Sequence, residues 1–262
     1  MPLIEQIGKR LYLSEARRTV LEGARETLGA VERLEMANAD LKGPRRGRLR
    51  PAVTTTANYF MPRLRGEFAA QHPGVELTLG VTNGEGLLAR MAANEDDFDV
   101  AGEPPEGARV VCRPFAEKRL LVIARPDHPL ARLRQVPLAR LAEEFFLGRE
   151  SGSGARAAAE RWLAQRGMAL RYRMELGSNE AIKQGVLGGL GIAILAEASV
   201  AMELAAGALV ALPVAGFPIR RPWYLMWRAD KDLSLVARAF VEHLRGGVSL
   251  AVPVVRRHEA AA

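Results

Sequence analysis

Short apolar segments with the character of strands alternate with helical segments between residues 49 and 244, and this alternation restricts the possible folds more than any other feature. Strands joined by helices run parallel, and the helices cover both faces of the sheet. The pattern therefore predicts an α/β fold. The strands are expected at Leu49–Val53, Val75–Val81, Phe98–Ala101, Leu120–Ala124, Phe145–Leu147, Arg171–Leu176, Ile192–Leu195, Leu209–Leu212 and Trp223–Trp227. The helices are expected at Asn58–Gln71, Gly86–Ala93, Ala155–Gln165, Glu180–Leu187, Glu197–Ala205 and Leu233–Leu244.

The alternation falls into two blocks that are joined near residues 121 and 224. Two blocks joined twice predict two lobes with a ligand-binding cleft between them. The first lobe is expected to contain residues 44–120 and 225–250, and the second lobe residues 121–224. Residues 251–262 are expected to form a frayed tail.

Residues 14–43 precede the two blocks and predict one long helix. From Ser14 to Leu41 the sequence has no proline, Ser14 can cap the amino end, and Gly43-Pro44 ends the helix. At about 1.5 Å per residue such a helix is ~40 Å long. One small domain does not cover a seam of that length, so we expect a second copy of the chain to pack against it. The seam consists of Leu21, Ala24, Leu28, Val31 and Leu34.

The positive charge is concentrated at the amino end. Residues 1–50 hold 11 of the 37 Lys and Arg residues but only 7 of the 30 Asp and Glu residues. A basic segment on a near-neutral body is typical of a protein that contacts nucleic acid through one part. An arginine-rich composition from a GC-rich genome explains the same excess, so charge alone leaves both interpretations open. The side chains best placed for DNA phosphates are Lys9, Arg10, Arg45 and Arg46.

No pattern in the sequence predicts catalysis or metal binding. The four histidines lack cysteine or glutamate partners at ligand spacing, and nucleophile-elbow and phosphate-loop motifs are absent. The single cysteine, Cys112, excludes an internal disulfide. We expect neither a signal peptide nor a membrane span, because no apolar run reaches ~20 residues. The chain is therefore expected to be a cytoplasmic protein that is not an enzyme and carries no cofactor.

Small polar residues follow four of the expected strands at the points where helices begin. Such positions expose backbone N–H groups and the positive end of the helix dipole, which bind anions. Each cluster alone is explained as a helix cap, but the carboxyl ends of strands in an open α/β sheet face the ligand crevice. Arg156 either adds a charged contact there or is a solvated helix residue. The clusters are Thr54–Thr56, Thr82–Gly84, Ser151–Gly154 and Ser178-Asn179.

Motifs along essentially the whole chain resemble those of LysR-type transcriptional regulators. The resemblance is strongest to the CbbR-like branch, which controls carbon-fixation genes. The matching segments, in chain order, are Ile4–Ala16, Thr54–Pro62, Asp96–Phe98 with Gly102–Glu106, His128–Ala131, Arg149–Arg156, Ser178–Lys183 with Gly189–Gly191, and Arg221–Tyr224.

The resemblance implies a long N-terminal linker helix followed by a two-lobed effector domain similar to periplasmic binding proteins. Residues 1–13 then correspond to the remnant of the DNA-binding wing, and residues 14–43 to the dimerising linker helix. The recognition helix of the winged helix-turn-helix is expected to be missing through a late start codon or a truncation. Specific DNA binding is expected only with that segment restored, and weak, salt-sensitive, non-specific binding without it.

The sequence therefore predicts a ligand-responsive transcription regulator that forms a homodimer or homotetramer. A stand-alone small-molecule-binding module is the alternative, and the DNA upstream of Met1 distinguishes the two. The effector is expected to be a small anionic metabolite, such as a phosphorylated sugar or organic acid. Hydroxyls and helix N-termini are expected to hold it without a buried cation. The residues expected to bind it are Thr54, Thr55, Thr56, Asn83, Gly102, Glu150, Ser151, Gly152, Ser153, Arg156, Ser178 and Asn179.

The substitution Leu28→Asp tests the seam. A carboxylate at the centre of an apolar helix–helix contact is expected to convert the dimer to a monomer, because burying an unpaired charge is unfavourable. Sedimentation of the variant and the wild type measures this. A variant that sediments as a wild-type dimer would argue against the seam.

Overall fold

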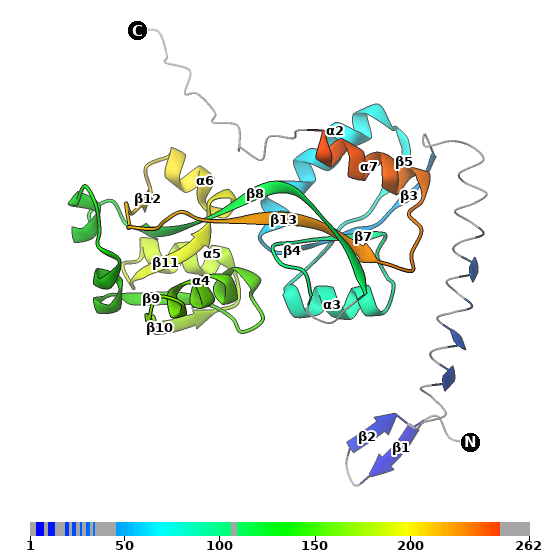
Figure 1. Ribbon diagram of the computed structural model, residues 1–262, viewed down its shortest axis with the longest axis horizontal. Helices are drawn as coiled ribbons and strands as arrows, with labels where there is room; N and C mark the ends of the chain where they lie inside the picture. Colours follow the sequence, from blue (N-terminus) through cyan, green and yellow to red (C-terminus); the bar gives the residue numbers. More distant parts are fainter. Residues whose placement is uncertain are drawn as a thin grey trace.

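A computed structural model describes residues 46–105 and 109–246 together with parts of the amino-terminal segment (Figure 1). In that segment it describes the backbone of residues 4–7 and 10–13 and eight helical residues between Thr19 and Leu34. The side chains of Arg10 and Arg46 and the whole of Lys9 and Arg45 lie outside the described part, so the predicted DNA contacts remain predictions.

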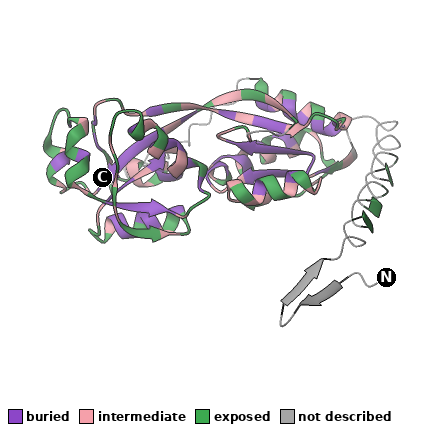
Figure 2. Cartoon of the chain, turned by 60° about the horizontal axis from the view of Figure 1, so that its bottom comes forward, coloured by how far each residue is buried: buried purple, intermediate pink, exposed green. Residues whose placement is uncertain are grey.

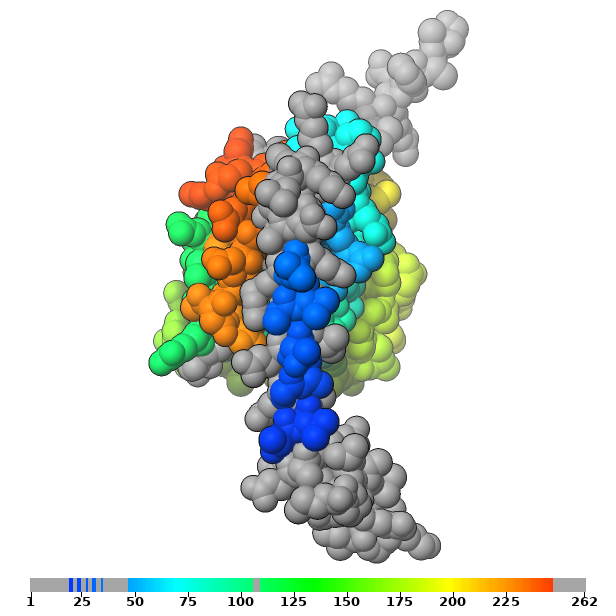
Figure 3. Space-filling view, turned by 90° about the vertical axis from the view of Figure 1, so that its right-hand side faces the viewer, coloured from blue at the N-terminus to red at the C-terminus, as the bar shows by residue number. Residues whose placement is uncertain are grey.

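The amino-terminal segment begins with an antiparallel hairpin of β1 (Ile4–Ile7) and β2 (Arg10–Leu13). The helical residues that follow stand beside the first lobe in Figure 1 and cross its end in Figure 3. Of the predicted seam, Leu21 and Leu28 lie outside the described residues, and Ala24, Val31 and Leu34 are exposed. Leu34 is 71% exposed within one chain, which is consistent with a seam that needs a second copy. No helix in the described part of the chain has the length and apolar character to cross a bilayer.

One nine-stranded sheet extends through both lobes, because two long antiparallel strands belong to each of them. These are β8 (Val110–Ala124) and β13 (Ile219–Arg228). In the first lobe β13 pairs with β7 (Phe98–Ala101), which pairs in turn with β4 (Pro51–Thr54) and then β6 (Gly80–Thr82). In the second lobe β8 pairs with β11 (Ile192–Ala196) and β12 (Val210–Ala211), and β11 continues to β9 (Phe145–Arg149) and β10 (Arg171–Leu176).

Helices cover both faces of each half of the sheet, as the alternation predicts. The first lobe carries the 3-10 turn η1 (Ala57–Tyr59) and the helices α2 (Met61–Gln71), α3 (Gly84–Ala92) and α7 (Leu235–Arg245). The second carries α4 (Gly154–Ala164), α5 (Asn179–Leu187), α6 (Glu197–Ala205) and the 3-10 turns η2 (Pro129–Arg132) and η3 (Leu138–Glu143). The two-lobed α/β class is therefore confirmed.

Each lobe has its own hydrophobic core (Figure 2). In the first lobe five aromatic side chains that are at most 1% exposed lie between the sheet, α2 and α7. Aromatic side chains bury large apolar areas, so this cluster stabilises the lobe independently of the second. The five are Phe60, Phe68, Phe98, Trp223 and Phe240.

The chain passes between the lobes slightly earlier than the sequence indicated. Ala116 and Trp223 pack into the first core, whereas Leu120 and Ile219 pack against α4 in the second lobe. The crossing therefore lies at residues 117–119 of β8 and 220–222 of β13. Trp223, expected in the second lobe, belongs to the first.

Two of the predicted strands are wrong in extent. Val75–Val81 forms two strands in different sheets, β5 (Gly74–Leu77) and β6, and Leu49–Val53 is divided between β3 (Arg46–Leu49) and β4. The Arg50 N–H donates to the Asp97 carboxylate at 2.6 Å, which interrupts the strand between β3 and β4. A carboxylate from 47 residues away is invisible to local periodicity.

Strand β8 also begins ten residues before the predicted Leu120–Ala124. Its first part contains Arg113, Pro114, Glu117 and Lys118 and leaves several of these side chains exposed. It therefore lacks the apolar run by which buried strands are found.

One oxygen of a buried carboxyl group in the first lobe lacks a hydrogen-bond partner. Asp99 on β7 is 2% exposed, and its Oδ1 accepts no hydrogen bond among the described residues. The pKa of Asp99 is raised to about 8, mainly by burial and also by the nearby Asp96 charge. The positive charges of Lys231 and Arg90 act in the opposite direction and lower this pKa. The folded protein therefore binds a proton that the unfolded chain releases near pH 4.

Asp99→Asn is expected to remove a pH-dependent loss of stability. The pKa of Asp99 is higher in the folded protein than in the unfolded chain, so Asp99 contributes fully to the free energy of unfolding only below pH 4. As the pH rises from 4 towards 8, this contribution is lost at up to ~1.4 kcal/mol per pH unit. In urea denaturation, the free energy of unfolding of the variant relative to that of the wild type should be higher at pH 8.5 than at pH 5. The exposed Asp232→Asn serves as control, and parallel curves for Asp99→Asn and wild type would contradict the assignment.

Candidate functional site

The loops that follow the parallel strands of both lobes face one another at the junction between the lobes. In the first lobe these loops carry Thr54–Thr56 after β4, Asn83 after β6 and Gly102 after β7. In the second they carry Glu150–Ser153 after β9 and Ser178-Asn179 after β10. The predicted residues, apart from Arg156, therefore come from the two sets of strand ends, as expected for an α/β ligand site.

Three contacts join these loops directly. Arg149 at the end of β9 donates to the Thr55 hydroxyl at 3.2 Å, and the Tyr59 hydroxyl donates to the Glu180 carboxylate at 2.8 Å. The loop at Gly152 approaches the start of α3 so closely that a side chain on Gly84 would lie 3.1 Å from the Gly152 carbonyl oxygen. Gly152 itself has φ of +86°, a conformation that favours glycine. The two lobes thus touch through the predicted ligand-binding loops.

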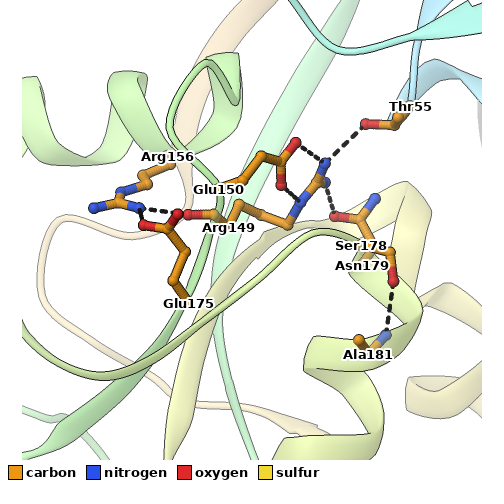
Figure 4. Close-up of polar contacts among 8 residues, drawn as sticks. All are labelled: Thr55, Arg149, Glu150, Arg156, Glu175, Ser178, Asn179 and Ala181. Atoms are coloured by element: carbon orange, nitrogen blue, oxygen red, sulfur yellow. Dashed lines mark hydrogen bonds and ion pairs between the residues drawn. The ribbon is translucent and has the colours of Figure 1, made fainter.

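Arg149 is the centre of this junction, although the sequence did not single it out as a ligand-site residue (Figure 4). Its side chain is 2% exposed. It donates to both carboxylate oxygens of Glu150, at 2.7 and 2.8 Å, and to the Asn179 side-chain oxygen at 2.5 Å. With the Thr55 bond, every nitrogen of the guanidinium has a protein acceptor, so Arg149 positions Glu150, Asn179 and Thr55 relative to one another.

The helix starts divide into two kinds. The Asn83 and Ser178 side chains accept hydrogen bonds from Gly86 N–H (2.8 Å) and Ala181 N–H (3.1 Å), so these two oxygens serve as helix caps. Thr56 and Ser153 also precede helical turns but make no side-chain cap bond. They are 5% and 6% exposed. Neither hydroxyl oxygen is among the fully buried side-chain atoms without a partner, so the two hydroxyls are the better candidates for ligand contacts.

Arg156 does not point into the junction. Its guanidinium donates to Glu160 (2.8 Å), to the Arg149 carbonyl oxygen (2.6 Å) and to Glu175, and it lies over the Tyr172 ring with its central carbon 4.6 Å from the centroid. In Figure 4 Arg156 and Glu175 lie on the side of Arg149 away from Thr55. In this structure Arg156 of α4 therefore binds Glu175 of β10, and its expected ligand contact stays a prediction.

A buried cation from the crossing of β8, which the sequence also missed, completes the junction. Lys118 is 6% exposed, and its Nζ lies 4.7 Å from the centroid of the Trp223 ring. The same atom lies 2.9 Å from the position that a side chain on Gly102 would occupy, so the glycine makes room for it. Burial lowers the pKa of Lys118 to about 8, while the Glu103 charge opposes this shift and the charges of Arg221 and Arg149 add to it. The junction thus contains a buried cation that the sequence did not indicate, and effector binding without a buried cation stays a prediction.

The described residues also form a pocket of about 350 Å³ at the other end of the second lobe. Its walls include Arg125, His128, Glu144, Phe145 and Arg173, near the amino ends of β9 and β11. Arg125 is paired with Asp127, and Arg173 donates to the Leu190 carbonyl oxygen at 3.3 Å. Within the described part of the chain no three His, Cys, Asp or Glu side chains are placed to hold a metal ion.

The chain matches a family model described as the LysR substrate binding domain over residues 42–249. It is 43% identical over 244 residues to the HTH-type transcriptional activator CmpR of Synechocystis sp., which covers 93% of this chain and 80% of CmpR. It is 44% identical over 243 residues to the RuBisCO operon transcriptional regulator of Acidithiobacillus ferrooxidans, with 93% of this chain and 79% of that protein covered.

Solved structures of transcriptional regulators are also similar to this chain. The regulatory domain of Synechocystis PCC6803 CcmR in complex with 2-PG superposes with a TM-score of 0.74 at 45% identity, covering 77% of this chain and 97% of that one. A Corynebacterium glutamicum OxyR mutant superposes with a TM-score of 0.71 at 21% identity, covering 93% and 76% of the two chains, which shows a shared fold.

Arg149→Lys tests the positioning role of the guanidinium. A lysine keeps the charge but cannot bond Glu150 through two oxygens while also bonding Asn179 and Thr55. We expect the free energy of unfolding to fall by about 1–3 kcal/mol in urea titrations. Arg140→Lys, at an exposed pair with Glu143, is the control and should change little. Equal stability of the wild type and Arg149→Lys would contradict this role.

Proposed function

The chain belongs to the LysR family of transcriptional regulators, and from that premise we propose that its two-lobed domain senses a small phosphorylated organic acid bound between the lobes. Binding would change how the lobes are held together and hence the geometry of a DNA-bound oligomer. The regulated genes would be those of carbon fixation, because the relatives include regulators of RuBisCO operons.

The observation that carries this proposal is a pair of hydroxyls on largely buried residues, Thr56 from the first lobe and Ser153 from the second. Each precedes a helical turn without capping it, and neither hydroxyl oxygen is among the fully buried polar atoms without a partner. Hydroxyls that are not used as caps and are not sealed inside the protein are free to donate to a ligand, and a hydrogen bond to a charged acceptor is stronger than one to a neutral acceptor. Ser153 also stands at the start of the eleven-residue helix α4, whose first backbone N–H groups favour an anion.

The chemistry of the ligand follows from these donors and from the relatives. Hydroxyls, backbone N–H groups and a buried ammonium all donate hydrogen bonds, so the ligand must be rich in acceptor oxygens. The similar CcmR domain is in complex with 2-PG, 2-phosphoglycolate, which carries a phosphate and a carboxylate. We therefore take 2-phosphoglycolate and other small phosphorylated acids as first candidates for this protein.

The partners on the DNA side follow from the amino-terminal segment. Lys9, Arg10, Arg45 and Arg46 would contact phosphates, and the seam of the long helix would join two chains. The contact between Arg149 and Thr55 gives the effector a way to act on that assembly, because any ligand that moves one loop against the other changes the relative position of the lobes.

Removing one hydroxyl at a time tests the site. Thr56→Val and Ser153→Ala keep the packing but lose a donor, and each should weaken binding of 2-phosphoglycolate several-fold to about a hundredfold, since a hydrogen bond to a charged acceptor contributes up to about 3 kcal/mol. Isothermal titration calorimetry measures the affinities. Thr78→Val, which removes an exposed hydroxyl between β5 and β6 outside these loops, is the control and should bind like the wild type.

A panel of phosphorylated sugars and dicarboxylates extends the same measurement to other ligands. If both variants bind the best anion as tightly as the wild type, the site is misplaced even though the family assignment stands. If the wild type binds none of these anions, the proposed effector class is wrong.

A further inference from the structure

We propose that Lys118 selects the charge of the effector, so that the junction binds a phosphomonoester in its dianionic form with the phosphate against the Lys118 ammonium. This inference rests on the proposed function and makes it more specific. It is carried by the burial of Lys118, by its position beside the start of α4 and by the balance of charges around it.

Lys118 is a buried cation without a protein anion. In the described part of the chain no carboxylate lies within ion-pair distance of its Nζ and no hydrogen bond holds it, and its neighbour is the Trp223 ring. Lys183 shows what this fold does with a buried lysine elsewhere: its Nζ lies 2.7 Å from both the Glu180 and Glu203 carboxylates. Buried lysines are normally paired in this way, so Lys118 is the exception that an anionic ligand would explain.

The position of Lys118 brings it to the start of α4. Side chains two residues apart on a strand share a face, and Leu120, two residues along β8, packs with Ala155 and Ala158 of α4. Lys118 therefore lies on the α4 side of the crossing, towards the first turn of the helix and the unbonded Ser153 hydroxyl. An ammonium, a hydroxyl and a helix N-terminus on one side of the junction form a site for a phosphate group.

The fixed charges around Lys118 leave an excess of two positive charges. Glu103 forms ion pairs with two arginines, Arg161 from α4 and Arg221 from β13. One carboxylate neutralises one of the two arginines, so one positive charge is not compensated. Arg149 and Glu150 neutralise each other. Lys118 adds the second uncompensated charge. A phosphate dianion balances this excess, whereas a monocarboxylate leaves half of it in place.

The same electrostatics predict a proton uptake. Arg149 and Arg221 and the low-dielectric surroundings disfavour the charged ammonium, and Glu103 only partly opposes them, so the pKa of Lys118 is about 8. A phosphate dianion against Nζ favours the charged form and raises that pKa. Above pH 8, therefore, binding should take up a fraction of a proton from the buffer.

The decisive experiment compares Lys118→Met with the matched control Arg113→Met, which removes an exposed positive charge from the same strand. Methionine fills the space beside Trp223 without a charge, so we expect Lys118→Met to melt at a higher temperature than the wild type. We also expect it to bind 2-phosphoglycolate about ten- to a hundredfold more weakly in calorimetry. Arg113→Met should bind like the wild type. Opposite changes in melting temperature and affinity are not produced by a merely structural lysine.

Two further readouts test the charge state. At pH 8.5 the wild-type binding enthalpy should depend on the ionisation enthalpy of the buffer, and that of Lys118→Met should not. Below pH 6 the wild-type affinity should fall towards tenfold per pH unit, because the phosphate monoester takes up its second proton there. Glycolate, which lacks the phosphate, should bind the wild type more weakly than 2-phosphoglycolate does. Its affinity for Lys118→Met should equal its affinity for the wild type.

The outcomes separate this inference from the proposed function. If the wild type binds 2-phosphoglycolate and Lys118→Met binds it as tightly, or if the affinity is the same at pH 5 and pH 7, the role of Lys118 is overturned while the effector site stands. A lower melting temperature of Lys118→Met shows a structural role and also overturns it. If the wild type binds no phosphorylated acid, the proposed function fails first and this inference fails with it.

Discussion

The antiparallel pairing of β8 with β13 is the constraint on which the rest of the molecule depends. These two strands pair from Val110 with Arg228 to Leu120 with Ile219, and no other described strand belongs to both lobes. A two-stranded connection lets the lobes move as bodies while it fixes which of their edges face each other. Because the parallel strands of each lobe extend from this connection, their carboxyl ends and the loops after them are brought to the same junction.

The junction separates two tasks that a single arginine or lysine performs in simpler sites. Each of the three guanidinium nitrogens of Arg149 donates to Glu150, Asn179 or Thr55, so Arg149 holds loops from both lobes in place. Lys118 has no such acceptor and stands on the connecting strand itself. The loops are therefore positioned by the Arg149–Glu150 ion pair, which costs less free energy to bury than an unpaired charge does. The uncompensated charge is on Lys118, the residue that would contact the ligand.

The residues show why some of this was visible in the sequence and some was not. Strand–helix alternation predicted the two-lobed class, and polar residues after strands predicted Thr55, Thr56, Ser153 and Asn179, because both signals are local. Arg149, Lys118 and the Asp97 bond to Arg50 depend on partners 30 or more residues away, and no local period carries that information. For Arg156 the sequence left a ligand contact and a helix residue open, and in the structure Glu160 of its own helix and Glu175 of β10 bind it.

A buried cation at the junction changes how a regulator of this kind can respond to its effector. A site made only of hydroxyls and helix ends from both lobes gains hydrogen bonds when the lobes are together, but it contains no charge that opposes this arrangement in the absence of the ligand. Lys118 and Arg221 stand opposite each other on the paired strands that connect the lobes, and Arg161 from the second lobe meets Arg221 at Glu103, so positive charges repel one another where the lobes meet. A dianion removes that repulsion only in the arrangement in which the lobes are together. The ligand then has a differential affinity for one arrangement, and differential affinity is what a ligand needs in order to shift a conformational equilibrium.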